Sequence, residues 1–175
     1  MKAWIFVCFL ALFCLGVPGG QTSAAIVIIN CTELQAMQDS LSGDYILAND
    51  IDCSETINWN GGLGFEPIGD GTNKFTGTFD GQGHTISDLY INSNAESDVG
   101  LFGYIDTGAS ISNVGLVNVD ISGDDYVGGL VGYNFEGTIT NSYATGNVNG
   151  DTYVEGLVSD NYGTIENSWY SYSRF

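Results

Sequence analysis

The chain has 175 residues, with 21 Asp and Glu against three Lys and Arg, and a formal net charge of −18 at pH 7. Such an acidic surface repels nucleic acid and anionic membranes, because it offers no cationic stripe that could displace phosphate counterions. Hydrophobic residues make up 43% of the sequence and aromatic residues 13%, so the composition indicates a folded domain rather than an acidic disordered tail.

The first 24 residues have the pattern of a secretory signal. Lys2 precedes an apolar run from Ala3 to Leu15, and a Gly-Val-Pro-Gly break then leads to small residues suited to cleavage. The apolar run is too short to span a bilayer, and no later segment resembles a transmembrane helix. We therefore expect a secreted or cell-surface protein, with a signal peptide at 1–24 and a single domain at 25–175.

Two cysteines, Cys31 and Cys53, lie outside this signal, and in an exported protein they are expected to form a disulfide. Closing a loop of this length stabilises a fold by roughly 3 kcal/mol in the chain-entropy account. A metal or redox site is the weaker alternative, because no second Cys or His is near either residue. Asn30 begins the only Asn-x-Thr sequon, and a disulfide at the centre of that sequon would hinder glycosylation.

An N-terminal cap and first coil are expected at 25–74. Thr32 and Gln35 form a capping-box pattern that predicts a short helix at about 33–41, and residues 45–47 read as a strand. The disulfide would join this strand region to the helix. Because a solenoid exposes unpaired strand edges at its end, this unit is interpreted as the cover of that end.

Repeat coils are expected at 75–175, where the sequence is all strand and turn. Three segments are versions of one unit: 99–124, 127–151 and 154–171. Their Gly-Leu pairs at Gly100, Gly129 and Gly156 are 29 and 27 residues apart, a period typical of solenoids. The glycines at these positions are expected to serve tight turns or close backbone approach.

A column of short polar side chains is predicted within the coils. An Ile-x-Asn or Ile-x-Asp pattern recurs, and its polar residues are Asp88, Asn113, Asn141 and Asn167. If successive coils stack about 4.8 Å apart, these side chains can hydrogen-bond to one another along the stack. The sequence thus predicts an all-β fold, a single-stranded right-handed parallel β-helix with a short N-terminal capping helix. A β-propeller is the alternative, and it needs a longer repeat of about 40–50 residues.

The segment 128–134, followed by 137–146, closely resembles the GLUG repeat of secreted bacterial and archaeal surface proteins. Upstream pieces resemble the segment that usually precedes such repeats, at 47–52, 65–69 and 75–86. The resemblance covers roughly residues 30–170 and implies a pectin-lyase-like β-helix. It also implies a place in adhesin-like surface proteins, or in immunoglobulin A peptidases whose repeats are not the catalytic part. Glu155 and Ser159 depart from the motif, which has glycines there.

Polysaccharide cleavage is the enzymatic alternative, by analogy with other proteins of this fold. A lyase acting on uronates needs basic residues, and the coils between residues 77 and 171 contain no Lys or Arg. A hydrolase needs two carboxylates about 5–9.5 Å apart. The acid-rich coils offer candidates at Asp88, Asp120, Asp124, Asp125 and Glu136. His84, the only histidine, is predicted to be a turn residue rather than a general base.

Two further ligand classes can be weighed. Calcium is a weak candidate, since carboxylates suit it, but exposed acids about 5 Å apart repel by only about 0.8 kcal/mol and need no ion. The residues concerned are Asp98, Asp124, Asp125 and Asp151.

Exposed aromatic side chains can stack on sugars or dock a protein, although packing within turns is an equal alternative. The candidates are Tyr126, Tyr133, Tyr143, Tyr153 and Trp169.

The sequence therefore predicts an exported, non-enzymatic β-helix module for surface display or adhesion, with a carbohydrate or a surface protein as partner. No cofactor, nucleic-acid binding or membrane insertion is expected. A polysaccharide-active hydrolase, or a fragment of a larger surface protein or peptidase, are the alternatives. The segment 169–175 has no evident cap, which predicts end-to-end association.

Overall fold

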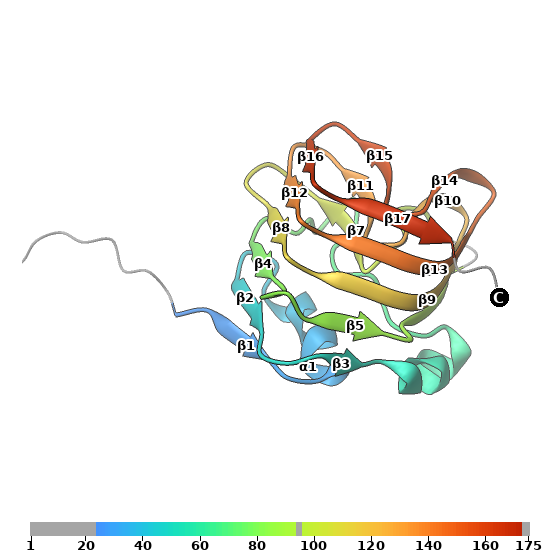
Figure 1. Cartoon of the computed structure of the whole chain (residues 1–175). Coiled ribbons are helices and arrows are strands. Elements are labelled where there is room, and N and C mark those ends of the chain that lie inside the picture. Colours follow the sequence, from blue (N-terminus) through green and yellow to red (C-terminus); the bar gives the residue numbers. More distant parts are fainter. Residues whose placement is uncertain (1–23, 94–95, 173–175) are drawn as a thin grey trace, which may run out of the picture.

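The computed structural model describes residues 24–93 and 96–172, so the signal peptide expected at 1–24 lies almost entirely outside the described residues. The chain winds in successive coils around one axis, and each strand pairs in parallel with its equivalent in the next coil. Figure 1 shows the coils rising from the N-terminal cap, through β5, β9 and β13, to β17. The predicted all-β parallel β-helix is confirmed.

Four parallel sheets form the sides of this solenoid. The first sheet contains, in spatial order, β1 (Ile26–Ile28), β2 (Asp44–Leu47), β4 (Thr78–Asp80), β8 (Ser110–Ser112), β12 (Thr138–Thr140) and β16 (Thr164–Glu166). The second contains β3 (Ile51–Asp52), β5 (Thr85–Ser87), β9 (Gly115–Gly123), β13 (Tyr143–Asn149) and β17 (Trp169–Tyr172), and β6 (Tyr90–Ser93) also pairs with β9. The third contains β7 (Phe102–Ile105), β11 (Val131–Asn134) and β15 (Val158–Asn161). The fourth contains β10 (Asp125–Gly128) and β14 (Thr152–Glu155).

Aliphatic and aromatic side chains fill the interior of the coils. Ile111 and Ile139 lie in register on β8 and β12, and both are fully buried. Nearer the cap the interior holds phenylalanines: the ring of Phe102 lies 4.9 Å from that of Phe75 and 5.5 Å from that of Phe79. Each coil therefore buries its apolar side chains against the coils above and below, which is the main source of stability in a solenoid.

The cap consists of α1 (Cys31–Gln35), a 3-10 turn at Ala36–Asp39 and a longer irregular 3-10 segment at Ser54–Gly62. The predicted helix at 33–41 is thus shorter and begins earlier. Its N-cap is Asn30, whose side chain accepts the Glu33 N–H at 2.9 Å, while the Glu33 carboxylate accepts the Ile29 N–H at 2.9 Å. This pair is a variant of the capping box, because Glu33 accepts from the residue before the N-cap, and it forms in place of the predicted Thr32 and Gln35.

The predicted disulfide between Cys31 and Cys53 is confirmed, and it joins α1 to the chain that follows β3. Gln35 makes a second link, because its side chain both donates to and accepts from the backbone of Glu66, at 2.9 and 2.8 Å. These bonds hold the helix over the N-terminal end of the interior, where Leu34 and Met37 are fully buried.

Candidate functional site

A ladder of amides runs along the corner that follows the first sheet. Asn167 donates to Asn141 at 3.4 Å, and Asn141 donates to Asn113 at 3.2 Å. The ladder ends on Asp80, whose carboxylate accepts from Asn113 at 3.0 Å. The three asparagines all have left-handed backbone, with φ between 49° and 53°. Asn tolerates this conformation better than most residues, so the ladder fixes the corner of each coil.

The prediction that Asp88 belongs to this column is wrong. Ile86 pairs with Leu116 in the second sheet, whereas Ile111 pairs with Phe79 in the first. The similar tripeptides therefore occupy different corners, because the repeat pattern cannot distinguish two corners that both use Ile-x-Asp/Asn. Asp88 instead accepts a hydrogen bond from Asn118 at 2.6 Å.

The acidic turns stack only in part. Asp151 N–H donates to Asp124 C=O at 2.8 Å, and Asp125 lies in register with Thr152. Asp98 does not lie in register with Asp125, since the bridge between Val99 and Val127 aligns it with Tyr126. Within the part of the chain that the structure describes, no group of three or more His, Cys, Asp or Glu side chains is arranged to hold a metal ion.

Asp98 nevertheless occupies an acidic setting. Burial raises the pKa of its carboxyl, and the nearby charges of Asp160 and then Asp70 raise this pKa further. Its carboxyl lines a hollow with Asp70, Glu66 and Glu96. A carboxyl that is buried near other acids takes up a proton more readily than an isolated one.

Five tyrosines gather on the third and fourth sheets, and we call them the tyrosine surface: Tyr104, Tyr126, Tyr133, Tyr153 and Tyr162. The rings of Tyr104 and Tyr133 stack at 4.7 Å, and those of Tyr126 and Tyr153 at 4.8 Å with an angle of 2° between their planes. Tyr126 meets Tyr133 edge to face at 5.8 Å, which joins the two columns. The sequence pointed to three of the five members, and Gly103-Tyr104, aligned with Gly132-Tyr133, could have identified a fourth.

Two members of the tyrosine surface have an unfavourable backbone. Tyr126 has a φ of 55° and Tyr153 a φ of 51°, and Asp98 has a φ of 61° at the equivalent position one coil earlier. Left-handed backbone costs roughly 1–2 kcal/mol for a residue with a Cβ, and a bulky side chain there is uncommon. Two successive coils thus place a tyrosine where Asn or Gly would be less strained, and such strain concentrates at functional sites.

Two phenol groups of this surface, those of Tyr126 and Tyr133, have raised pKa values. Burial, followed by the neighbouring Tyr162, Tyr104 and Asp160, raises the pKa of Tyr133 to about 12. Burial and then Tyr153 also raise the pKa of Tyr126. The hydroxyls of Tyr126 and Tyr133 are therefore hydrogen-bond donors as well as acceptors under physiological conditions.

Lys74 lies at the base of the tyrosine surface. Its Nζ is 3.2 Å from Asp106 Oδ2 and 4.7 Å from the centre of the Tyr104 ring. The hydrogen bond to Asp106 is the main cause that raises the Lys74 pKa. The same Nζ lies 5.6 Å from the centre of the Phe135 ring, so this ammonium group is held by one carboxylate and two rings, and it anchors the loop before β4 to β7.

A second aromatic pair lies on a different side of the solenoid. The rings of Tyr143 on β13 and Trp169 on β17 stack at 4.8 Å with 5° between their planes. Gly115 precedes them in the same column, and a Cβ there would lie 2.4 Å from the Tyr143 ring. The structure thus separates Tyr143 and Trp169, in the second sheet, from the tyrosine surface on the third and fourth sheets.

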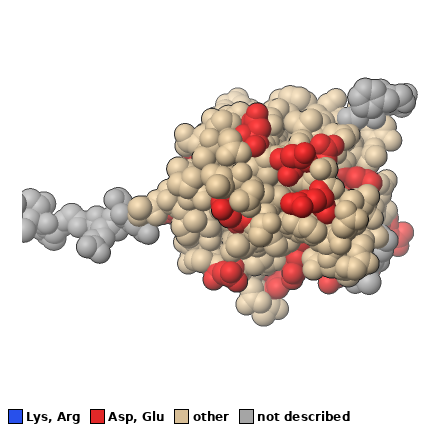
Figure 2. Space-filling model, turned by 90° about the horizontal axis from the view of Figure 1, so that it is seen from below, with Lys and Arg blue, Asp and Glu red and all other residues tan. Residues whose placement is uncertain are grey.

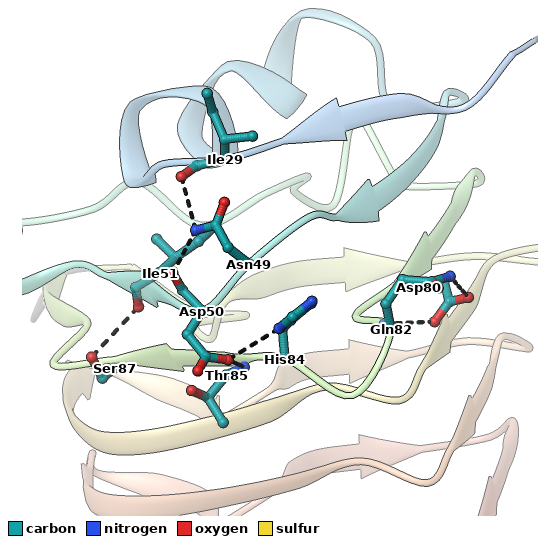
Figure 3. A network of polar contacts seen from close by, with 9 residues as sticks. All are labelled: Ile29, Asn49, Asp50, Ile51, Asp80, Gln82, His84, Thr85 and Ser87. Carbon is teal, nitrogen blue, oxygen red and sulfur yellow. Dashed lines mark hydrogen bonds and ion pairs between the residues drawn. The ribbon is translucent and has the colours of Figure 1, made fainter.

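His84 lies in a turn, as predicted, and its N–H donates to Gly81 C=O at 2.8 Å. Its Nδ1 is 3.3 Å from Asp50 Oδ1, and the same oxygen accepts the Thr85 N–H at 2.9 Å (Figure 3). The Thr85 N–H is the main cause that lowers the Asp50 pKa. These contacts join the loop before β5 to the loop before β3.

The carboxylates named as hydrolase candidates are distributed over several corners. Asp88 accepts from Asn118, Glu136 accepts from Thr107 at 2.9 Å, and Asp125 accepts from Thr152. Asp120 lies on β9, and Asp124 follows that strand. Three of the five candidates are therefore engaged in hydrogen bonds between neighbouring coils.

Comparison with known proteins finds one family motif and two relatives. Residues 123–149 match the GLUG motif model. Over 137 residues the chain is 42% identical to Halomucin of Haloquadratum walsbyi, a match that covers 74% of this chain and 2% of Halomucin. Over 98 residues it is 37% identical to a candidate Gly-rich membrane protein of Evansella cellulosilytica, covering 54% of this chain and 11% of that protein. The chain therefore spans only a small part of these two relatives.

Among solved structures, the crystal structure of a candidate immunoglobulin A1 protease from Bacteroides ovatus resembles this fold. The TM-score is 0.62 at 20% identity, and the match covers 88% of this chain and 59% of that one. At such low identity the likeness concerns the fold alone. No helix within the described residues is both long and apolar enough to cross a bilayer. The chain therefore contains a GLUG motif at residues 123–149, within coils that stack as a parallel β-helix.

Proposed function

We propose that this chain is an exported, non-enzymatic β-helix module of a cell surface, and that its tyrosine surface binds a neutral glycan. The GLUG motif and the similarity to Halomucin and to a Gly-rich membrane protein support a module of a surface-type protein. These comparisons name no ligand. The proposal of a glycan therefore rests on the chemistry of the side chains.

The left-handed backbone at Tyr126 and Tyr153 carries the proposal. Stacking between the two rings contributes about 0.5–1.5 kcal/mol to stability. Left-handed strain costs about 1–2 kcal/mol at each tyrosine, so the stacking offsets the strain at one position but not at both. Residues that are costly for folding are often retained for binding. Tyr153 and Tyr162 each expose 64% of their surface, so part of the aromatic surface is accessible to a ligand.

The polar groups around these rings suit a neutral sugar. Phenol hydroxyls that stay protonated can donate to sugar oxygens, and the carboxylates of Asp125 and Asp160 lie near Tyr126 and can accept from sugar hydroxyls. Aromatic faces can cover the apolar C–H faces of a pyranose ring. An anionic glycan would meet these carboxylates and the net charge of −18, and would be repelled.

The proposal can be tested with an array of neutral and anionic oligosaccharides, probed with the chain from residue 25 onward. We expect binding to neutral glycans, and we expect the double variant Tyr126→Gly/Tyr153→Gly to lose at least about tenfold in affinity, which is about 1.4 kcal/mol. Glycine suits the backbone of both positions, so the variant should still fold.

The matched control is Tyr143→Ala/Trp169→Ala, which removes the aromatic pair of the second sheet and should leave binding unchanged. Binding that is lost only in this control would assign the ligand to the second sheet and overturn the proposed site. An array without any neutral ligand would overturn the glycan proposal itself.

A further inference from the structure

All four sheets end on the same face of the molecule. Their last strands are β14, β15, β16 and β17, which lie together at the C-terminal end of the solenoid in Figure 1. Within the described residues, no strand pairs with the outer edge of any of the four. We call this end the terminal face. An exposed edge of this kind is a template for another strand.

The hydrogen-bonding groups of β16 show how that edge is presented. Thr164 N–H donates to Gly137 C=O at 3.0 Å, and Glu166 C=O accepts from Asn141 N–H at 3.1 Å. Alternate residues of a parallel strand bond to opposite neighbours, so the N–H and C=O of Ile165 face away from β12. Ile165 thus offers one donor and one acceptor to a strand that would lie beyond it.

The side chains of the terminal face have the identities of interior positions. Ile165 continues the column of Ile111 and Ile139, yet it is 37% exposed while the other two are fully buried. Trp169 is 52% exposed, with one ring face against Tyr143. Asn167 is the last member of the amide ladder within the described residues, and its side chain donates to Asn141. The side-chain column, the ring stack and the ladder therefore all stop at an incomplete coil.

A second copy of the chain cannot supply the missing coil through its N-terminal end. That end offers β1 to the first sheet and the short β3 to the second, and its described residues provide no strand for the third and fourth sheets. It is also acidic: Figure 2 shows Asp and Glu spread over this end, with no Lys or Arg in view among the described residues. The terminal face carries exposed Asp151, Glu155 and Glu166, so the two ends would repel one another.

We propose that the terminal face is a strand-pairing interface for a further β-helix coil, one that offers a strand to each of the four sheets. Such a coil would place an amide side chain above Asn167, a flat ring above Trp169 and an aliphatic side chain above Ile165. It would carry few acids, because the face already presents three. This proposal rests on the unpaired edges of the sheets. It is independent of glycan binding by the tyrosine surface.

The proposal is tested by extending the chain. In the extended chain, Tyr172 continues directly into a second copy of residues 147–172, which restores the register because Tyr172 pairs with Gly146. We expect the exchange of the Ile165 amide proton to slow by at least about tenfold relative to the parent chain. Acrylamide quenching of Trp169 should fall in parallel, read in a background that carries Trp59→Phe and has Phe in place of the tryptophan of the second copy. A chain extended by a shuffled version of the same residues is the matched control.

An Ile165 amide that exchanges as fast in the extended chain as in the parent and in the shuffled control would overturn the proposal. Replacing Ile165 with Pro gives a second check, because the only backbone donor it removes is the outward N–H, and Ile165→Ala controls for the loss of the side chain. Ile165→Pro should abolish the protection of Trp169 in the extended chain. Protection that persists would show that the added segment covers the face without pairing to β16, and would contradict strand addition.

Two other occupants are distinguished by measurements on the parent chain. A stable dimer in sedimentation velocity at low salt, with Trp169 shielded, would assign the face to a second copy. Shielding of Trp169 only when residues 1–24 are present would assign it to that segment. Either result would overturn the proposal, which expects a monomer with an accessible Trp169 in both forms.

Discussion

Left-handed residues are the points at which each coil turns its corner. Asn113, Asn141 and Asn167 occupy one such column, while Asp98, Tyr126 and Tyr153 occupy another. In the first column the side chains bond to one another, so the residue best suited to the backbone also supplies the ladder. In the second column the first residue is an acid, Asp98, and the next two coils have a strained tyrosine at the same position. The same left-handed backbone is therefore adopted by Asn in one column, with little strain, and by Tyr in the other, with greater strain.

Variants of Asn141 separate two effects on stability: the side-chain hydrogen bonds of the ladder and the left-handed backbone of the corner. Asn141→Gly keeps a permissive backbone but removes the bonds to Asn113 and Asn167, and we expect a loss of about 1–2 kcal/mol in the free energy of unfolding. Asn141→Ala removes the same bonds and adds left-handed strain, for a further loss of about 1–2 kcal/mol. Urea unfolding of the two variants measures the difference. Equal stabilities would show that the backbone conformation is not a constraint.

Tyr126 should behave differently from a core residue. Tyr126→Gly loses about 0.5–1.5 kcal/mol of ring stacking and gains about 1–2 kcal/mol from relief of left-handed strain. The extra freedom of glycine in the unfolded chain offsets about 0.4–1 kcal/mol of that gain. We expect the stability to change by less than about 1 kcal/mol in thermal or urea unfolding. A loss above about 3 kcal/mol would make this tyrosine a structural residue and remove the argument for binding.

Tyr133 predicts a pH dependence at high pH. Its pKa in the folded chain is about 12, above the ordinary value of 10.0. Because the folded-state pKa is raised, its contribution to stability is complete below pH 10 and is lost as the pH rises through about 12. Absorbance titration of the phenolates should show a group ionising near pH 12 that is absent from Tyr133→Phe. Identical titration curves for the two proteins would contradict the assignment.

At the scale of single elements, the disulfide decides how firmly the cap is held. Replacing Cys31 and Cys53 by Ser should cost about 3 kcal/mol, from the greater entropy of the unfolded chain. For a domain of this size that corresponds to a fall in Tm of about 6–12 °C. Thermal unfolding with and without a reducing agent, on the chain from residue 25 onward, gives the measurement. A Tm that does not respond to reduction would show that Leu34 and the Gln35 bonds hold the cap without the disulfide.

The sequence could reveal the period of the coils but not the corner to which each residue belongs. Ile86-Ser87-Asp88 and Ile111-Ser112-Asn113 look alike, yet they lie in different sheets, because β5 pairs with β9 while β8 pairs with β4. The true end of the ladder, Asp80, directly follows Phe79 and lies in register with Ser112 rather than with Asn113. A search for the Ile-x-Asn spacing therefore misses it, because both the apolar residue and the position of the polar residue differ.

The tyrosine surface was only partly visible in the sequence for a similar reason. Tyr126 and Tyr133 lie in one repeat, and their spacing alone does not show that their rings meet across two sheets. The ring of Tyr162 stacks on that of Tyr133, although the residue of β15 that lies in register with Tyr133 is Asp160. The step between Asp98 and Tyr126 differs by one residue from the step that would align Asp98 with Asp125. Register of this kind depends on loop lengths that the three-dimensional stack determines.

At the scale of the whole molecule, one end is closed and the other is open. The cap, with its disulfide and buried Leu34, covers the N-terminal end of the interior. At the opposite end Ile165, which continues an interior column, is partly exposed. In a solenoid each coil is stabilised mainly by its neighbours, so stability should fall from the central coils toward β16 and β17.

Residue-resolved amide hydrogen exchange on the chain from residue 25 onward tests this account most directly. We expect the slowest exchange in β8, β9, β12 and β13, and an alternation in β16 in which Thr164 and Glu166 are protected while Ile165 is not. This pattern follows from coils stacked in parallel register with an open terminal edge. Uniform protection across β16, or an Ile165 amide that exchanges as slowly as that of Ile139, would contradict both the register and the open face.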